Sequence, residues 1–401
     1  GADLLINISA SPYHLQKKKT RLKLIRQKAK QFKKAICYAN LIGGQDEVVF
    51  DGGSFLMDAK GKLINRAKEF EEDIIYWDMP KLKPKRIKTT HGKIKVTRIS
   101  VPRSKENPAL PDNGTKPLSR AEEAYQALVL GTRDYVLKNG FKSVVIGLSG
   151  GIDSALTAAI AQDAIGSANV TGVTMPSKYS SRATQRDAVK LAKNLGISLL
   201  RVPIKTIYNA YIKTLKESFK RTKRDAAEEN IQARIRGNIL MAFSNKFGWL
   251  VLTTGNKSEM AVGYATLYGD MAGGYAVLKD VPKGLVYDLA DFYNQRANKE
   301  VIPLSTIKRA PTAELKRNQK DQDTLPPYDF LDTVLGQYVE EDASFSDIVK
   351  KQKNPKIVKR IIRMIDFNEY KRRQAPPGIK ITSKAFGKDR RLPITNRYQE
   401  F

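Results

Sequence analysis

Cysteine, histidine and long apolar runs are scarce in this sequence. Cys37 is the only cysteine among 401 residues, which excludes an internal disulfide and a cysteine-rich metal site. The two histidines, His14 and His91, provide too little for a histidine-based zinc site. We find no apolar run of about 18 residues, as a transmembrane helix needs, and no signal-peptide pattern at the start. We therefore expect a cytoplasmic protein with no membrane partner.

Acidic residues are also few for a chain of this size. Asp and Glu number 41 against 71 Lys and Arg, so the formal net charge is +30. Such a field attracts polyanions, and it also favours small anionic substrates such as nucleotides. A charged, solvated surface gives the same composition, and we expect no nucleic-acid partner from charge alone.

The pattern of apolar residues divides the chain into three regions: residues 1–103, a Pro-, Asn- and Gly-rich linker over 104–118, and residues 119–401. The first region predicts a strand over 2–9, a basic helix over about 14–34 and further strands in "AICYANLI" and "EVVFDGGSFLMDAKGKLI". From residue 119, buried strands alternate with helices. This alternation is typical of an α/β fold with a doubly wound parallel sheet, in which ligands bind beyond the carboxyl ends of strands.

One such strand end carries "SGGIDS", residues 149–154, between an apolar strand and an alanine-rich helix. It is neither a Walker loop, which would end in Gly-Lys-Ser/Thr, nor a dinucleotide fingerprint. Gly150 and Gly151 allow a tight turn with N–H groups aimed at an anion, and Ser149 and Ser154 add hydroxyl donors. Asp153 would repel a phosphate unless it held a bridging Mg²⁺. A glycine turn that merely caps the helix is the alternative.

The "SGGIDS" loop resembles the pyrophosphate loop of the N-type ATP pyrophosphatases, which split ATP into AMP and pyrophosphate. Further blocks resemble the NAD synthetases of the glutamine-dependent bacterial kind: "EENIQARIRGNILMAFSN", "TTGNKSEMAVGYATLYGDMAGG", "VLKDVPK", "DQDTLPPYD" and "NEYKRRQAPPGIKIT". The resemblance runs from about residue 119 to the end. It implies ATP-dependent amidation of deamido-NAD to NAD through an acyl-adenylate, with release of AMP and pyrophosphate.

The resemblance also implies site residues. Asp153, Glu259 and Lys283 would be catalytic, with Asp153 and Glu259 holding Mg²⁺. The residues expected to bind ATP are Gly147, Leu148, Ser149, Gly150, Gly151, Ile152, Asp153, Ser154, Thr254, Lys283 and Thr312. Those expected to bind deamido-NAD are Asn230, Arg234, Glu259, Asp270 and Lys371. We interpret the basic tail, residues 350–401, as a loop or lid that clamps polyphosphate.

The first region resembles the C-terminal part of a nitrilase-like glutaminase domain, a partial α-β-β-α sandwich, through "LLINISASPY" and "ANLIGGQDEVVFDGGSF". Ser11 and Lys17 resemble glutamine-contacting positions. In the family, the catalytic cysteine, glutamate and lysine lie upstream of these motifs, so we expect the glutaminase half to be incomplete here. Cys37 follows the motif and is expected to be structural. The chain would then use ammonia, receive the missing half from another chain, or be part of a longer protein.

Two other functions fit parts of the sequence. A tRNA-modifying ATP pyrophosphatase would suit the net charge, although the paired cysteines or added RNA-binding domain that many such enzymes need are not visible. A non-catalytic NAD- or RNA-binding protein would need a decayed site, whereas Asp153, Glu259 and the paired glycines are present. The resemblance implies a homo-oligomer with a dimeric synthetase core.

Overall fold

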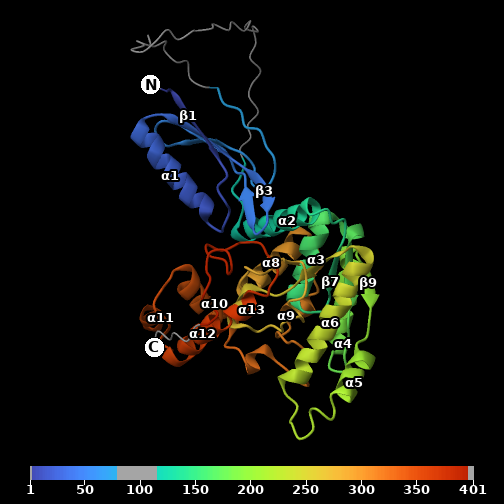
Figure 1. Cartoon of the computed structure of the whole chain (residues 1–401). Helices are drawn as coiled ribbons and strands as arrows, with labels where there is room; N and C mark the ends of the chain where they lie inside the picture. Colours follow the sequence, from blue (N-terminus) through green and yellow to red (C-terminus); the bar gives the residue numbers. More distant parts are fainter. Residues whose placement is uncertain (1, 79–114, 396–401) are drawn as a thin grey trace. The chain divides into compact units, whose positions relative to one another are not determined.

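The computed structural model describes residues 2–78 and 115–395, and the chain divides into two compact units (Figure 1). Residues 1–11, 18–41 and 52–117 form the first unit. The second unit comprises residues 12–17, 42–51 and 118–401. Most of the predicted linker, residues 104–114, lies outside the described residues. No described helix is both long and apolar enough to cross a membrane.

The first unit is a four-stranded mixed sheet covered on one face by a helix. Its strand order is β1-β2-β5-β6, and only β1 and β2 pair in parallel. Helix α1 (Lys17–Phe32) packs Ile25 and Ala29 against the sheet residues Ile36, Tyr38, Phe55 and Met57. The strands are β1 (Leu4–Ser9), β2 (Ala35–Asn40), β5 (Phe55–Met57) and β6 (Leu63–Arg66).

The other face of this sheet carries exposed apolar side chains. Ile6 and Ile8 of the edge strand β1 are 67% and 87% exposed. Cys37 lies opposite Ile6 and Leu56 in the neighbouring strands. Its thiol is free, and burial raises its pKa, which disfavours the reactive thiolate. These observations agree with a structural cysteine.

The second unit is built on a five-stranded parallel sheet, as the alternation of strands and helices predicted. The strand order is β11-β10-β7-β8-β9, and every pairing is parallel. After β7 the chain builds two strands outward on one side, and then returns to build two on the other. The strands are β7 (Val144–Gly147), β8 (Val170–Thr174), β9 (Ser198–Arg201), β10 (Leu250–Thr253) and β11 (Tyr275–Ala276). The reversal places a topological switch point between β7 and β10.

Helices cover both faces of this sheet. Helices α2, α3 and α8 contact one another, and α3 packs on β7 and β8 while α4 packs on β8 and β9. On the other face, Tyr208 of α5, Ile235 of α6 and Ile204 just before α5 are buried against Val145, Val173 and Val251. The helices are α2 (Arg120–Lys138), α3 (Ile152–Ile165), α4 (Arg182–Leu195), α5 (Lys205–Thr214), α6 (Ala226–Phe247) and α8 (Lys283–Arg296). A short helix, η1 (Ser167–Asn169), precedes β8.

The C-terminal helices form a second core beside α7 (Lys257–Val262), seen in red and orange in Figure 1. Val358, Ile361, Ile362 and Ile365 of α12 are fully buried there. The elements are α9 (Leu304–Lys308), η2 (Asp321–Asp323), α10 (Tyr328–Leu335), η3 (Gly336–Glu340), α11 (Phe345–Gln352), α12 (Pro355–Phe367) and α13 (Glu369–Arg372). The prediction of a loop or lid was wrong for this part of the tail, because its apolar face makes it a packed helical element.

A hairpin from the region assigned by sequence to the first domain belongs to the second unit. Strands β3 (Ile42–Gln45) and β4 (Val48–Asp51) pair only with each other, and β3 lies on α2. The Gly44 N–H donates to Asp134 Oδ2 at 2.7 Å, and Lys138 Nζ donates to the Gly44 carbonyl at 2.6 Å. The predicted strand "AICYANLI" is therefore interrupted at Leu41, where β2 ends and this hairpin begins.

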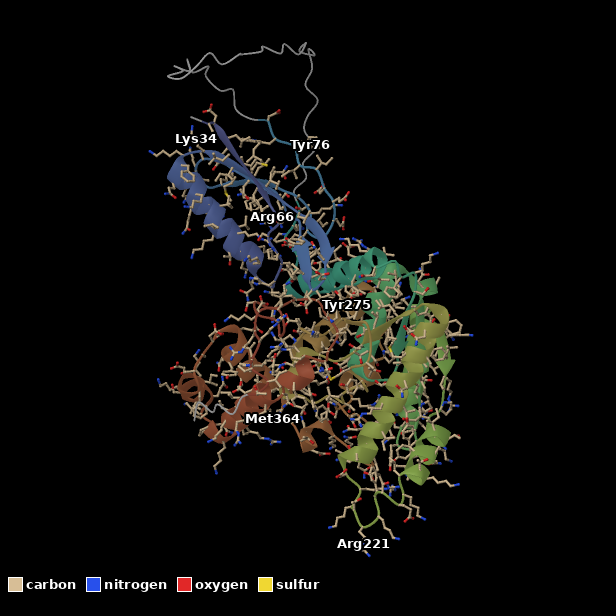
Figure 2. All side chains as sticks on the ribbon, viewed as in Figure 1. Lys34, Arg66, Tyr76, Arg221, Tyr275 and Met364 are labelled. Carbon is tan, nitrogen blue, oxygen red and sulfur yellow. The ribbon has the colours of Figure 1, made fainter. Side chains whose placement is uncertain are left out.

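Charged side chains dominate the loop between α5 and α6. Figure 2 shows Arg221 at the end of this loop, and the neighbouring Lys220, Lys223 and Arg224 are exposed as well. Part of the large positive charge therefore lies on a solvent-exposed loop, as is usual for a run of basic residues.

Candidate functional site

A cavity of about 300 Å³ opens at the switch point of the parallel sheet. Its walls include the segments that follow β7 and β10, the two strands between which the chain reverses. The sheet thus brings together most of the residues singled out by sequence. Those lining the cavity are Gly147, Leu148, Ser149, Gly150, Gly151, Ile152, Asp153, Ser154, Thr254, Glu259, Asp270, Lys283 and Thr312.

The loop after β7 has the conformation that its glycines suggested. Gly150 adopts φ +83°, and a Cβ there would lie 2.2 Å from the Thr184 carbonyl oxygen. Gly151 is the N-cap of α3, and its N–H donates to Ser149 Oγ at 3.2 Å. Ser154 Oγ lies 3.2 Å from Ser149 Oγ. The turn is therefore tied to its helix by serine hydroxyls, with the positive end of the α3 dipole facing the cavity.

The segment after β10 caps helix α7 and reaches across to the first loop. Asn256 accepts from the Glu259 N–H at 3.0 Å, which is one half of a capping box. The same amide donates from Nδ2 to Asp153 Oδ1 at 2.9 Å, and Asn256 is fully buried. Asn256 therefore fixes the two loops relative to each other.

Lys283, at the start of α8, joins the carboxylates of both loops. Its Nζ lies 2.5 Å from Asp153 Oδ2 and 3.3 Å from Glu259 Oε1, and the residue is 1% exposed. Burial alone would lower the pKa of Lys283, but the charges of Asp153 and Glu259 outweigh it and raise that pKa. The ammonium also lies 5.3 Å from the centre of the Tyr328 ring. Lys283 is therefore charged and held in place at the cavity wall.

A third carboxylate, Asp321, lies near this pair. Its oxygens accept from the hydroxyls of Tyr264 at 3.1 Å and Tyr328 at 3.0 Å. The pKa of Glu259 is raised to about 7: desolvation raises it most, the positive charge of Lys283 lowers it, and the charges of Asp153 and Asp321 raise it. Desolvation also raises the pKa of Asp321, although the two tyrosine hydroxyls oppose the shift. The site therefore concentrates negative charge around one lysine.

These residues fit a magnesium ion. Asp153 Oδ2 and Glu259 Oε1 lie 2.5 and 3.3 Å from Lys283 Nζ, so the two carboxylates that would hold the ion line the same part of the cavity. Mg²⁺ is commonly held by one or two carboxylates, with water and substrate phosphates completing its shell. No cluster of three or more His, Cys, Asp or Glu suited to a metal occurs within residues 2–78 and 115–395. The donor set therefore suits Mg²⁺ bound together with a phosphate substrate rather than a preformed protein cage.

Three predicted dinucleotide-binding residues lie outside the cavity wall. Asn230 accepts from Thr266 Oγ1 at 2.8 Å, and the exposed Arg234 donates to the Leu267 carbonyl at 3.2 Å. Lys371 Nζ donates to the carbonyls of Gly263 and Ala265 at 2.7 and 2.9 Å. All three hold the segment that follows α7, and Asp270 at the end of that segment lines the cavity.

The two predicted glutamine-binding residues are in the N-terminal region. Ser11 accepts from Arg21 Nε at 3.0 Å through its hydroxyl, and its N–H donates to Asn40 Oδ1 at 3.0 Å. Lys17 is the first residue of α1, and its backbone N–H donates to the His14 carbonyl at 3.0 Å. Neither contact tests a role in glutamine binding, which stays a prediction.

Several residues of the site were missed in the sequence. Asn256 stands within the quoted block "TTGNKSEMAVGYATLYGDMAGG". It precedes Glu259 by three residues, a spacing that is typical of a capping box and could have identified it. Arg236 lines the cavity, and burial lowers its pKa to about 10. Arg309 also lines it, donating to the Gly150 carbonyl at 3.3 Å and pairing with Asp187. Nothing in the sequence distinguished these arginines from the other basic residues.

Comparison with known proteins agrees with this architecture. Residues 124–375 match the NAD synthase family, and residues 1–83 match the carbon-nitrogen hydrolase family. The chain is 50% identical to glutamine-dependent NAD(+) synthetase of Thermotoga maritima, over 100% of this chain and 71% of that protein. The corresponding protein of Aquifex aeolicus is 48% identical over 99% of this chain and 71% of its own length.

A solved structure shares the fold as well. Glutamine-dependent NAD+ synthetase from Acinetobacter baumannii, in complex with adenosine diphosphate, is 40% identical with a TM-score of 0.67, covering 100% of this chain and 69% of that one. An NAD synthase domain and a carbon-nitrogen hydrolase domain on one chain define a two-domain amidating synthetase. The protein belongs to the family of glutamine-dependent NAD(+) synthetases.

Proposed function

We propose that this chain makes NAD by ATP-dependent amidation of deamido-NAD, releasing AMP and pyrophosphate. One observation carries the proposal: at the switch point, Lys283 joins Asp153 of the "SGGIDS" loop to Glu259 of α7 in one cavity. A phosphate loop beside a charged lysine and two carboxylates suits transfer of an adenylyl group. Membership of the NAD synthetase family points to the acceptor.

The chemistry explains why ATP is needed. The nicotinate carboxylate of deamido-NAD is a poor electrophile, because attack by ammonia would have to expel oxide. Attack of a carboxylate oxygen on the α-phosphorus of ATP forms an acyl-adenylate and expels pyrophosphate. Ammonia then attacks the carbonyl carbon, AMP leaves, and the nitrogen loses a proton to give the amide of NAD.

The chain's own residues would stabilise the charge that develops. The "SGGIDS" loop, with the N-terminus of α3, would receive the leaving pyrophosphate. Lys283 brings a fixed positive charge beside the same loop. Thr254 and Thr312 stand on the cavity wall as further hydroxyl donors. When bound, Mg²⁺ would neutralise phosphate charge, and Asp153 and Glu259 are the residues that would hold it.

The dinucleotide would be held from the segment after α7. Asp270 and Thr266 line the cavity, and Thr266 is bound to Asn230 of α6. Arg234 and Lys371 tether the same segment through its carbonyls. We propose that these residues bind deamido-NAD, in part by ordering this wall.

A product assay tests the proposal. Purified protein with ATP, Mg²⁺ and ammonium chloride is expected to release pyrophosphate only when deamido-NAD is present, and to form NAD and AMP in equal amounts. A parallel arm with glutamine identifies the nitrogen source. Pyrophosphate release that depends on tRNA and not on deamido-NAD would refute the proposal and support the tRNA-modifying alternative, which the family match does not favour.

We also propose a homo-oligomer with a dimeric synthetase core. Met241, Phe247 and Tyr268 are large apolar residues exposed on the second unit, by 37%, 52% and 67%. Sedimentation equilibrium is expected to give a mass at least twice the chain mass of 44.9 kDa. A monomeric mass at micromolar concentration would contradict this assignment.

A further inference from the structure

The geometry points to Lys257 as a positioning residue for the synthetase site, acting from behind helix α7. Lys257 does not line the cavity and is fully buried, yet its neighbours Asn256 and Glu259 contact Asp153 and Lys283. This inference rests on the function proposed above, since it concerns the same site.

The Lys257 ammonium is held by an unusually complete set of acceptors. Nζ lies 2.9 Å from Asp280 Oδ1, 3.0 Å from Glu340 Oε1, 2.5 Å from Thr382 Oγ1 and 3.0 Å from the Lys384 carbonyl. The backbone N–H of Lys257 also donates to the Val281 carbonyl at 2.9 Å. An ammonium has three hydrogens, so this network satisfies it fully and leaves it little freedom to move.

The acceptors come from segments that are themselves anchored. Asp280 Oδ2 accepts the N–H groups of Ile381 and Thr382 at 2.8 and 2.7 Å. The Thr382 hydroxyl donates to the same carboxylate and accepts from Lys257. Two further backbone hydrogen bonds hold this C-terminal segment. The Leu15 N–H donates to the Ile381 carbonyl at 2.8 Å, and the Lys380 N–H donates to the Glu47 carbonyl at 2.8 Å, which joins the segment to residues 12–17 and 42–51.

The first turn of α7 is thus fixed from both sides. Behind it, Lys257 is bound to residues 280, 340 and 382. In front, Asn256 binds Asp153, Glu259 binds Lys283, and Ser258 Oγ accepts the Lys283 N–H at 2.9 Å. A six-residue helix cannot hold these side chains in place by itself. The buried network therefore sets the separation between the two catalytic loops.

Substitution at Thr382 tests this role with little risk to the fold. Lys257→Met would leave Asp280 and Glu340 buried without their cation, which threatens folding. Thr382→Val removes the hydroxyl that accepts from Lys257 and donates to Asp280, and it puts a methyl group where Oγ1 lies 2.5 Å from Nζ. The ammonium must then move by about 1 Å to reach van der Waals distance, and Thr382→Ser restores the hydroxyl. Thr132→Val is a matched control, because Thr132 is also buried in the same unit and its hydroxyl has no partner within the part of the chain that is described.

Deamido-NAD-dependent NAD formation from ammonium is measured on the full chain, with thermal melting in parallel. We expect Thr382→Val to lower kcat by about tenfold to a hundredfold, because the two catalytic loops are no longer held at the separation that the reaction needs. KM for ATP should be nearly unchanged, because each loop keeps its own contacts to ATP. Thr382→Ser and Thr132→Val should match wild type. Wild-type kcat in Thr382→Val, a loss seen only in KM, or failure of Thr382→Ser to restore kcat would overturn the inference. An inactive wild type would instead refute the proposed function.

Discussion

Adding one methyl group at Gly150 tests whether the phosphate loop must keep its exact position for catalysis. Gly150→Ala places a side chain at φ +83°, a left-handed conformation that costs a non-glycine residue about 1–2 kcal/mol. The new Cβ would lie 2.2 Å from the Thr184 carbonyl oxygen, whereas ordinary contacts begin near 3.4 Å. Because Thr184 is on α4 and its carbonyl is backbone, the loop itself must move by about 1 Å. A displacement of that size in a positioned site costs about a hundredfold in rate.

Gly151→Ala is the matched control in the same loop. Gly151 has φ −88°, which any residue adopts, and its Cβ would lie 3.3 Å from Ser149 Oγ, a side-chain atom that can rotate away. An off-rotamer serine costs about 0.5–1.5 kcal/mol, and this converts to at most about tenfold in rate. The assay is kcat/KM for ATP in deamido-NAD-dependent pyrophosphate release. Wild-type kcat/KM in Gly150→Ala, or equal losses in the two variants, would refute this account of the loop.

Five further outcomes follow, the first four of them from the site. The pKa of Glu259 is raised to about 7, mainly by desolvation, so kcat/KM should rise with pH through that value. Glu259→Gln should remove this inflection, and a wild-type profile without it would contradict a role for the charged carboxylate. The same shift makes the folded state less stable as pH rises from about 4.5 to about 7, because the folded chain keeps this proton longer than the unfolded chain. Lys283→Met leaves two partly exposed carboxylates facing each other and should cost about 1–3 kcal/mol in urea unfolding, as well as nearly all turnover; an unchanged unfolding midpoint would show that the pair is not coupled. Asp153→Asn should abolish Mg²⁺-dependent turnover with the melting temperature preserved, and retained turnover would remove Asp153 from the metal site. Cys37→Ser should leave NAD formation unchanged, and a loss would show that this thiol is not merely structural.

The parts predicted from sequence are those in which local pattern dictates structure. Apolar strands alternating with helices predicted the parallel sheet, and the position of "SGGIDS" at a strand end predicted that this loop would face a ligand. The wall of that site was harder to predict. Arg234 and Arg236 are two residues apart, so they point about 200° apart on α6. Only the packing of α6 on the sheet decides that Arg236 reaches the cavity.

Side-chain contacts between residues far apart in the sequence could not be predicted from local pattern either. Asn256 binds Asp153 across 103 residues, and Asp321 draws its two hydroxyl donors from Tyr264 and Tyr328 on separate elements. Such contacts depend on how α7, α8 and α10 pack, which no local periodicity encodes. For the same reason, the basic tail was predicted to be a loop or lid, whereas the apolar face of α12 is buried in a helical core.

The most direct test of the central claim follows an oxygen atom. Deamido-NAD labelled with ¹⁸O at both carboxylate oxygens is incubated with the protein, ATP, Mg²⁺ and ammonium chloride, and the products are analysed by mass spectrometry. If the carboxylate attacks the α-phosphorus and ammonia then displaces AMP, one ¹⁸O appears in the phosphate of AMP and one remains in the amide of NAD. Unlabelled AMP, label in pyrophosphate, or release of ADP and phosphate would contradict the acyl-adenylate mechanism.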